Sequence, residues 1–567
     1  MRSRFTKSLA VLAACALVVG ALAGCAPKTS TTDGGNTTSN TPVKGGTMSF
    51  YIGDPAAIDP YNAQESEGVQ VVHQLFTSLT GFDPMDASKL VPAAAASWSA
   101  NADATVWTFK LDPNDKFSDG TPVKASDFVY AWNRIANPQT LNTATKKVDP
   151  SQISYHLGAV EGYADVQAGK ATEMSGLKAV DDLTFQVTLS EPFGDFEYVV
   201  AHPALAPVEK ALVEGGVDVN GTKVAFGDMP VGNGPFKMAE PWKHGQYIKV
   251  VANASYYGAK PMIDGVNFMT FKDPDTAYLE FQSGNLDFAQ ISLGKIKDAQ
   301  TKYGTSSDGF TANPTSQVLL GAENSTYYLV VNNKDGAMKN LALRKAVSLG
   351  VNRQAICDTL FEGTRAPADN IIPPGIAGYA PGVWAFSKYD PAAAAAALTE
   401  AGFPGGKGAP TISLTYNADG GHQKIMELVQ SDLTKLGLKV KLAPLTDFPT
   451  YLKALGAGKY QIGRLGWIAD YPIMDNFLYA IFNSKSTDNY SKYANTAVDE
   501  AIVEARKVTD TAARIKAYQA VDTMIGQDLP IIPLMFYKHH HVTSARVHDF
   551  VFSSMYLADF TKVWLSK

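Results

Sequence analysis

The sequence predicts a mixed α/β protein that folds into at least two lobes. Its 567 residues are too many for one simple hydrophobic core. Several short stretches alternate apolar and polar side chains, which is the pattern of half-buried strands. In the second half, residues 411–442 contain a strand, a helix and a strand in succession, which predicts parallel pairing of the two strands. These blocks divide the chain near residue 320.

The N-terminus predicts export and a lipid anchor. Arg2, Arg4 and Lys7 precede an apolar stretch at 9–23, which is too short for an ordinary membrane-spanning helix. The stretch ends in Leu22-Ala23-Gly24-Cys25, which resembles the lipobox of bacterial lipoproteins, where the cysteine is lipidated and becomes the first residue. An ordinary signal peptide or a short apolar anchor is the alternative.

The segment after Cys25 predicts a flexible tether. Residues 26–46 are rich in Thr, Ser, Gly and Asn and contain almost no large apolar side chain. Cleavage before Cys25 would leave Cys357 as the only cysteine without lipid, which excludes an intrachain disulfide. Acyl chains on Cys25 would hold the protein on the outer face of a membrane.

The elements of the body follow from local patterns. Alternation or apolar runs predict strands at 48–52, 106–111, 184–189, 327–331, 411–416 and 438–442. Helical spacing predicts helices at 423–436, at 391–401 behind Pro391, and around Leu343, Ala346 and Val347. Another helix is expected to begin near Phe128, with Ser126 or Asp127 as its cap.

Composition and motifs argue against several functions. A net charge of −6 offers no basic excess for nucleic acid, and three cysteines cannot form a disulfide scaffold. The chain lacks HExxH, GxSxG, Walker A and CxxC motifs, so neither an enzyme nor a cofactor site is indicated. Successive residues of His539-His540-His541 point to opposite faces of a strand, and no carboxylate is expected to complete a metal site there. Cys357 lies in a helical pattern and is expected to be buried and inert.

One loop is a candidate ligand contact. Trp467, Asp470 and Tyr471 cluster within residues 466–475, which follow a predicted strand at 460–465. A tryptophan and an aspartate on such a loop suit a ligand clamp. A buried tryptophan beside a capping aspartate would explain the same residues.

Residues 94–134 resemble the signature of the family 5 extracellular solute-binding proteins, the peptide-binding components of ABC importers. The matching positions are Trp98, Trp107-Thr108-Phe109, Leu111, Phe117-Ser118-Asp119-Gly120-Thr121-Pro122-Val123 and Asp127-Phe128-Val129. The similarity continues through 184–192, 232–236, 411–442, 460–482 and 529–533. It is strongest toward the oligopeptide-binding members.

The resemblance implies a two-lobed α/β fold of the periplasmic-binding-protein-like type II, cluster C class, with a hinge between the lobes and an extra domain inserted in the first. Lobe I would comprise residues 47–76, 210–322 and 540–567, the inserted domain 77–209, and lobe II 323–539. Residues 1–24 would be the signal peptide, and 25–46 the lipidated cysteine and tether. The names lobe I, inserted domain and lobe II denote these ranges below.

The resemblance also implies binding residues. Asp470, beside Trp467, would pair with the α-ammonium of a peptide, and Arg464 and His422 would lie near its carboxylate. Phe448 stands where the family has a tryptophan, so that stacking is kept and its hydrogen-bond donor is lost. Gln64, Glu65 and Ser66 replace the family's Glu-Gly-Val segment, whose backbone pairs with the ligand.

The implied mechanism is capture of an extended oligopeptide between the lobes, closure, and delivery to an ABC permease and its ATPase. The protein would be a monomer anchored by Cys25 at the cell surface, or in a periplasm if a second membrane exists. A binding protein for an oligosaccharide, a metal chelate or a signalling peptide is the first alternative. A peptidase or cell-wall hydrolase is the remote one.

Overall fold

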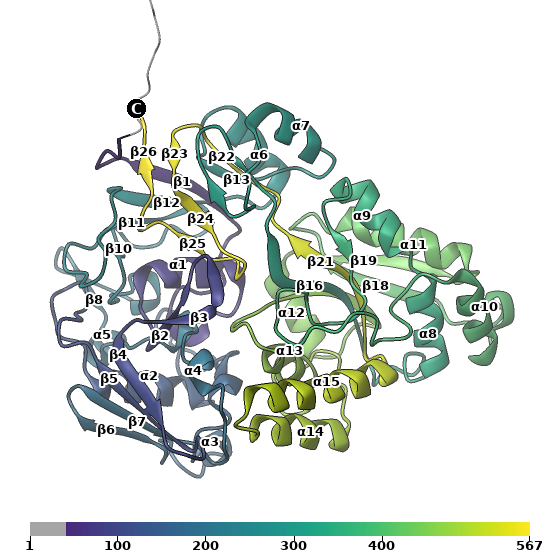
Figure 1. Cartoon of the computed structure of the whole chain (residues 1–567), viewed down its shortest axis with the longest axis horizontal. Helices are drawn as coiled ribbons and strands as arrows, with labels where there is room; N and C mark the ends of the chain where they lie inside the picture. The colour runs from purple at the N-terminus through teal and green to yellow at the C-terminus, as the bar shows by residue number, and fades with distance from the viewer. Residues whose placement is uncertain (1–40) are drawn as a thin grey trace, which may run out of the picture. The chain divides into compact units, whose positions relative to one another are not determined.

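Two open sheets organise the computed structural model, which describes residues 41–567 (Figure 1). The first has the strand order β10-β11-β12-β1-β13-β22-β15, and the second the order β17-β21-β16-β20-β18-β19. The first sheet consists of β10 (Phe236–Met238), β11 (Tyr247–Ala252), β12 (Gly265–Thr270), β1 (Thr47–Ile52), β13 (Phe288–Gln290), β22 (His541–Thr543) and β15 (Val318–Leu319). The second consists of β17 (Ala366–Pro367), β21 (Ile531–Lys538), β16 (Ala322–Val331), β20 (Ile462–Ile468), β18 (Ile412–Asn417) and β19 (Val440–Leu445). The predicted signal peptide and Cys25 lie outside the described residues.

The strand–helix–strand prediction in the second half is confirmed. β18 pairs in parallel with β19, with Leu414 opposite Leu442. The intervening α11 (Gln423–Lys435) buries Ile425, Val429 and Leu433 in a core shared with β18. Gly437 follows with φ of 98°, a left-handed conformation that favours glycine and ends the helix.

A third sheet lies within the inserted domain and has the order β4-β5-β7-β6. Its strands are β4 (Ala95–Ala100), β5 (Val106–Leu111), β7 (Thr184–Thr188) and β6 (Leu177–Asp181). The helix α2 (Ala125–Ala136) packs on it, with the rings of Phe128 and Trp132 5.7 and 5.1 Å from that of Phe185. The expected cap of this helix was wrong. It begins one turn earlier, after Lys124, and Asp127 is its third residue, whose carboxylate accepts the Lys124 backbone N–H at 2.8 Å.

The chain passes between the two large sheets twice, from β15 to β16 and from β21 to β22. The crossings lie side by side, because β16 pairs with β21 and β15 pairs with β22, both antiparallel. His539, between β21 and β22, donates its backbone N–H to Gly321 at 2.9 Å. Its Nδ1 lies 3.0 Å from Glu323 Oε1, a carboxylate contact that the local sequence did not indicate, and among residues 41–567 the three histidines are not part of a group that could hold a metal ion. Glu323 is in β16, far away in sequence and adjacent only through the crossing.

Helices cover the sheets and fill the space between them. They are α1 (Ser66–Leu75), α3 (Tyr163–Gln167), α4 (Phe196–Val199), α5 (Lys210–Gly215), α6 (Pro274–Gln282), α7 (Ile296–Tyr303), α8 (Leu341–Gly350), α9 (Arg353–Phe361), α10 (Pro391–Glu400), α12 (Phe448–Gly456), α13 (Met474–Phe482), α14 (Thr496–Arg506) and α15 (Thr511–Asp528). Cys357 in α9 is buried as expected, and burial raises its pKa to about 12. Among residues 41–567, no helix is both long and apolar enough to span a membrane.

A buried ion pair joins the first segment of lobe I to the inserted domain. Both guanidinium Nη atoms of Arg134 in α2 donate to the Asp59 carboxylate at 2.7 Å. The two side chains are only 6% and 4% exposed, and the guanidinium stacks 4.1 Å from the Tyr61 ring. Each charge therefore depends on the other for compensation.

Replacing Asp59 with Asn should lower the free energy of unfolding by about 3–5 kcal/mol, because the Arg134 charge would stay buried without an anion. Urea denaturation followed by circular dichroism measures the change. Asp86→Asn is the matched control, since Asp86 pairs with Lys89 at the exposed surface. Equal effects of the two substitutions would show that the buried pair does not stabilise this junction.

Candidate ligand-binding site

Asp470 lies directly after β20 and before α13, where the chain turns between a strand and a helix. Asn476 in α13 fixes its position: the Asn476 side-chain oxygen accepts the Asp470 backbone N–H at 2.9 Å, and its Nδ2 donates to Asp470 Oδ2 at 3.0 Å. The indole N–H of Trp467 donates to the same Asn476 oxygen at 2.8 Å. Trp467 thus orients Asp470 through Asn476, and it stands in the last part of β20 rather than in the loop.

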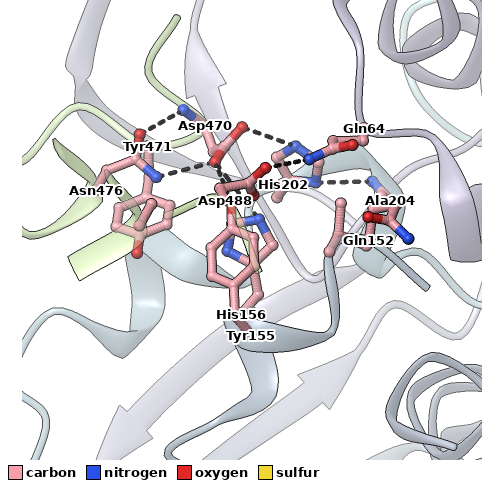
Figure 2. Close-up of polar contacts among 12 residues, drawn as sticks. Gln64, Gln152, Tyr155, His156, His202, Ala204, Asp470, Tyr471, Asn476 and Asp488 are labelled. Atoms are coloured by element: carbon pink, nitrogen blue, oxygen red, sulfur yellow. Dashed lines mark hydrogen bonds and ion pairs between the residues drawn. The ribbon is translucent and has the colours of Figure 1, made fainter. Parts of the chain in front are cut away.

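Three side chains of the inserted domain surround the Asp470 carboxylate (Figure 2). The Tyr155 hydroxyl donates to Oδ2 at 3.0 Å. His156 Nε2 lies 3.5 Å from Oδ2, and His202 Nε2 lies 3.4 Å from Oδ1. Burial raises the pKa of Asp470, but His202, His156 and Asn476 outweigh burial and lower it to about 2. The carboxylate is therefore ionised at neutral pH.

His202 supplies a hydrogen-bond donor rather than a lone pair. The ligand atoms of His156, His202 and Asp470 lie within 4.8 Å of one another, a spacing that a metal ion could also use. However, His202 Nδ1 accepts the Ala204 backbone N–H at 3.2 Å, which places the ring proton on Nε2, toward Asp470. With the His202 Nε2 lone pair unavailable, the cluster is better suited to holding a carboxylate that faces a cationic group.

A second polar cluster contains Arg464, His422 and Phe448. Arg464 in β20 donates from Nε to Asn417 Oδ1 at 2.8 Å and stacks 5.2 Å from the Phe448 ring. His422 immediately precedes α11, and its Nδ1 lies 3.4 Å from the Tyr327 hydroxyl. Burial, then the charges of Arg464 and Arg365, lower the pKa of His422 well below its usual value, so the ring is neutral at pH 7.

Arg365 is a buried cation that sequence reasoning missed. Its guanidinium lies 4.0 Å from the Phe361 ring and 4.6 Å from the Tyr537 ring. Within residues 41–567, neither Arg365 nor Arg464 forms an ion pair with a carboxylate at 4 Å or less; their hydrogen bonds go to neutral groups such as His540 and Asn417. The charges of Glu67 and Glu323 act on Arg464 and Arg365 without forming a direct ion pair. Two buried guanidinium groups without a directly paired carboxylate make this cluster a candidate carboxylate site.

Gln64 and Glu65 each make a different contact, and Ser66 begins a helix. Gln64 Nε2 donates to Asp488 Oδ1 in lobe II. Glu65 precedes α1, and its carboxylate accepts the Ala56 backbone N–H at 2.8 Å. Burial, then the charge of Glu67, raise the pKa of Glu65 to about 8. Ser66 is the first residue of α1, and pairing of this segment's backbone with a ligand remains a prediction.

The fold and these clusters define a two-lobed solute-binding protein, and comparison with known proteins identifies the family. The model of the bacterial extracellular solute-binding proteins, family 5, middle region, matches residues 89–489. The chain belongs to this family, which confirms the resemblance found in the sequence. Proteins of this family are described as solute-binding proteins.

Two similar relatives are named as peptide-binding proteins. The periplasmic murein peptide-binding protein MppA of Escherichia coli is 30% identical over 493 residues, which is 86% of each chain. The periplasmic oligopeptide-binding protein OppA of Salmonella typhimurium is 31% identical over 500 residues, which is 85% of each chain. Both relatives are named as periplasmic proteins, which supports export of this chain.

Solved structures confirm the predicted fold class. OppA of Haemophilus influenzae in complex with the peptide RPPGFSPFR has a TM-score of 0.78 and 27% identity, with 92% of this chain and 100% of that chain covered. The unliganded open form of MppA has a TM-score of 0.65 and 26% identity, with 93% and 99% covered. This chain thus superposes better on the peptide complex than on the open form.

The depressed pKa of His156 predicts how its ring titrates. Burial, which is the largest effect, lowers it to about 3 although Asp470 raises it. The ring should therefore stay neutral from pH 8 down to about pH 4 in ¹³C-histidine NMR spectra, with His156→Gln identifying the signal. Between about pH 3 and pH 6.5, which is the ordinary pKa of histidine, His156 is protonated in the unfolded chain and neutral in the folded one. The free energy of unfolding therefore decreases as the pH falls through this range. A titration midpoint near that of an unfolded histidine peptide would contradict the burial argument.

Proposed function

We propose that this chain is the lipid-anchored substrate-binding component of an ABC importer, which captures oligopeptides in extended form between two lobes and delivers them to a membrane permease. The observation that carries the proposal is the environment of Asp470. The Asp470 carboxylate is ionised, and hydrogen-bond donors from two segments far apart in the sequence surround it. The Asp470 side chain is still 16% exposed. A free α-amine is the one cation common to peptides, and a carboxylate prepared in this way binds it with charge-assisted hydrogen bonds.

The acceptor capacity of Asp470 suits this role. Tyr155, Asn476 and His156 approach Oδ2, whereas only His202 approaches Oδ1. A carboxylate oxygen accepts more than one hydrogen bond, so Oδ1 can accept from an ammonium without losing its present contact. The donors also replace water around the ion, which lowers the cost of keeping it ready in a buried position.

The cluster of Arg464, Arg365 and His422 supports the same function from the other end of the ligand. Two unpaired guanidinium groups would attract the peptide carboxylate, and main-chain hydrogen bonds would hold the extended segment between the charged ends. Side chains would then contribute little to recognition, which suits broad peptide uptake. The names of the relatives, which bind murein peptides and oligopeptides, point to the same cargo.

The amine anchor predicts strong discrimination against blocked peptides. Residues 26–567, freed of copurified ligand by unfolding and refolding, should bind Ala-Ala-Ala and bind N-acetyl-Ala-Ala-Ala about 100-fold or more weakly, because acetylation removes the cation that faces Asp470. Asp470→Asn should reduce the affinity for Ala-Ala-Ala by a similar factor. Isothermal titration calorimetry and native mass spectrometry measure both effects.

Asp522→Asn is the control for the peptide experiment. Asp522 is a buried carboxyl of lobe II that accepts the Trp384 indole N–H at 2.8 Å and lies outside both clusters. Its substitution should leave the discrimination unchanged. Equal binding of the free and acetylated peptides would refute the amine anchor and favour a sugar, a chelate or a dedicated ligand.

If Cys25 is lipidated, attachment of the protein to the membrane should depend on this residue alone. In the cell, the wild-type chain should sediment with membranes, and Cys25→Ser should be recovered in the soluble fraction, because the acyl chains supply the anchoring energy. Cys357→Ser is the matched control and should sediment like the wild type. Mass spectrometry of the mature N-terminus should find a diacylated or triacylated Cys25. A soluble wild-type protein would exclude the anchor.

A further inference from the structure

A second buried carboxyl group lies beside Asp470. Asp488 follows α13 and is 3% exposed. Its Oδ1 accepts the Gln64 amide, while its Oδ2 is buried without a hydrogen-bond partner. Figure 2 shows Asp488 next to Asp470 and Tyr155. The Tyr155 hydroxyl favours the ionised form of Asp488 but is directed to Asp470 Oδ2. A buried carboxyl oxygen without a partner is costly, and among residues 41–567 no hydrogen bond to Asp488 Oδ2 is formed.

Three parts of the chain meet at this point. Gln64 belongs to lobe I, and Tyr155 to the short helix Ser154–Leu157 of the inserted domain. The Thr487 hydroxyl, next to Asp488, donates to the Gln152 carbonyl at 2.9 Å and ties lobe II to the inserted domain. Asp488 therefore lies where a ligand held between the lobes would contact all three parts.

His156 provides an independent sign of a ligand at this place. The residue is 4% exposed, and both of its ring nitrogens lack a hydrogen-bond partner. Its Nε2 lies 3.5 Å from Asp470 Oδ2, so the ring is aimed at the carboxyl pair. A neutral imidazole can both donate and accept, which suits a ligand carrying N–H groups.

Charge balance indicates what the ligand brings. Burial, then the charge of Asp470, raise the pKa of Asp488 well above its usual value, which favours the protonated carboxyl while the site holds no second cation. Arg506, whose charge acts on His156, is committed elsewhere, because its guanidinium donates at 2.6 and 2.8 Å to Asp475. One α-ammonium balances Asp470 alone. A second positive charge would let Asp488 ionise and pair.

We propose that the site takes peptides that carry two positive charges at their amino-terminal end, with the α-ammonium on Asp470 and the cationic side chain of the first residue on Asp488. The proposal rests on the proposed function and adds a preference to it. On binding such a peptide, Asp488 releases its proton to solvent and becomes the carboxylate partner of the side-chain cation. An apolar first residue leaves Asp488 protonated.

The test compares Lys-Ala-Ala with norleucine-Ala-Ala, which has a similar side chain without the ammonium. Calorimetry should show that the lysine peptide binds about 10-fold or more tightly. Titrations in two buffers of different ionisation enthalpy should show about one more proton released with the lysine peptide. Asp488→Asn, which keeps an acceptor for Gln64, should bring the affinity ratio close to one and abolish the extra proton release. Asp522→Asn should change neither.

Each outcome decides the proposal. Equal affinity of the wild-type protein for the two peptides overturns it, as does a ratio that Asp488→Asn leaves intact. The proton count on the wild-type protein tests it even if the Asp488 variant does not fold. Binding of Ala-Ala-Ala distinguishes failure of this preference from failure of the proposed function. If Ala-Ala-Ala binds and the lysine and norleucine peptides bind equally, only the first-residue preference fails. If no peptide binds, the proposed function fails as well.

Discussion

A buried carboxylate stays ionised only where hydrogen-bond donors replace the water that it has lost. Asp470 meets this condition with one donor from its own neighbourhood, Asn476, and with Tyr155 and His202 from the inserted domain. The loop after β20 could not hold the charge alone. The position of the inserted domain against lobe II is therefore a requirement of the site, and the lobes, their sheets and their connecting strands serve to bring these groups together.

The same arrangement links ligand capture to the contacts between segments. Gln64 to Asp488 and Thr487 to Gln152 join residues that belong to three parts of the chain. Ligand groups placed among them would stabilise the arrangement in which these parts touch, and so shift the equilibrium toward it. The Arg464 cluster is built mainly from lobe II, so the two ends of a bound peptide would depend differently on closure.

The sequence predicted the elements more fully than the site. The βαβ unit at 411–442 has a clear change of period from two to 3.6, and it was found as expected. Asp470, Trp467 and Arg464 were accessible because they fall in one short motif. Tyr155 lies 315 residues from Asp470, and nothing near Tyr155, His156 or His202 resembles a binding motif. Such contacts arise from tertiary packing and have no local pattern. The His539–Glu323 contact was missed for the same reason, since Glu323 is adjacent only through the crossing. The cap of α2 was mispredicted for a local reason, because Asp127 caps from the third helical residue instead of preceding the helix.

The paired crossings at β15–β16 and β21–β22 have a kinetic consequence. Because the two connections lie side by side, rotation about them can separate the large sheets without breaking a strand of either. The barrier to separation then comes from the contacts across the gap, which include the buried Arg514–Asp195 ion pair between lobe II and the inserted domain, and from whatever is held there. The residence time of a captured molecule would thus be set by those contacts. A substitution of Thr487, whose hydroxyl donates to the Gln152 backbone carbonyl, would alter the escape rate of every ligand alike, because that hydroxyl is bonded to the carbonyl rather than to Asp470 or Asp488.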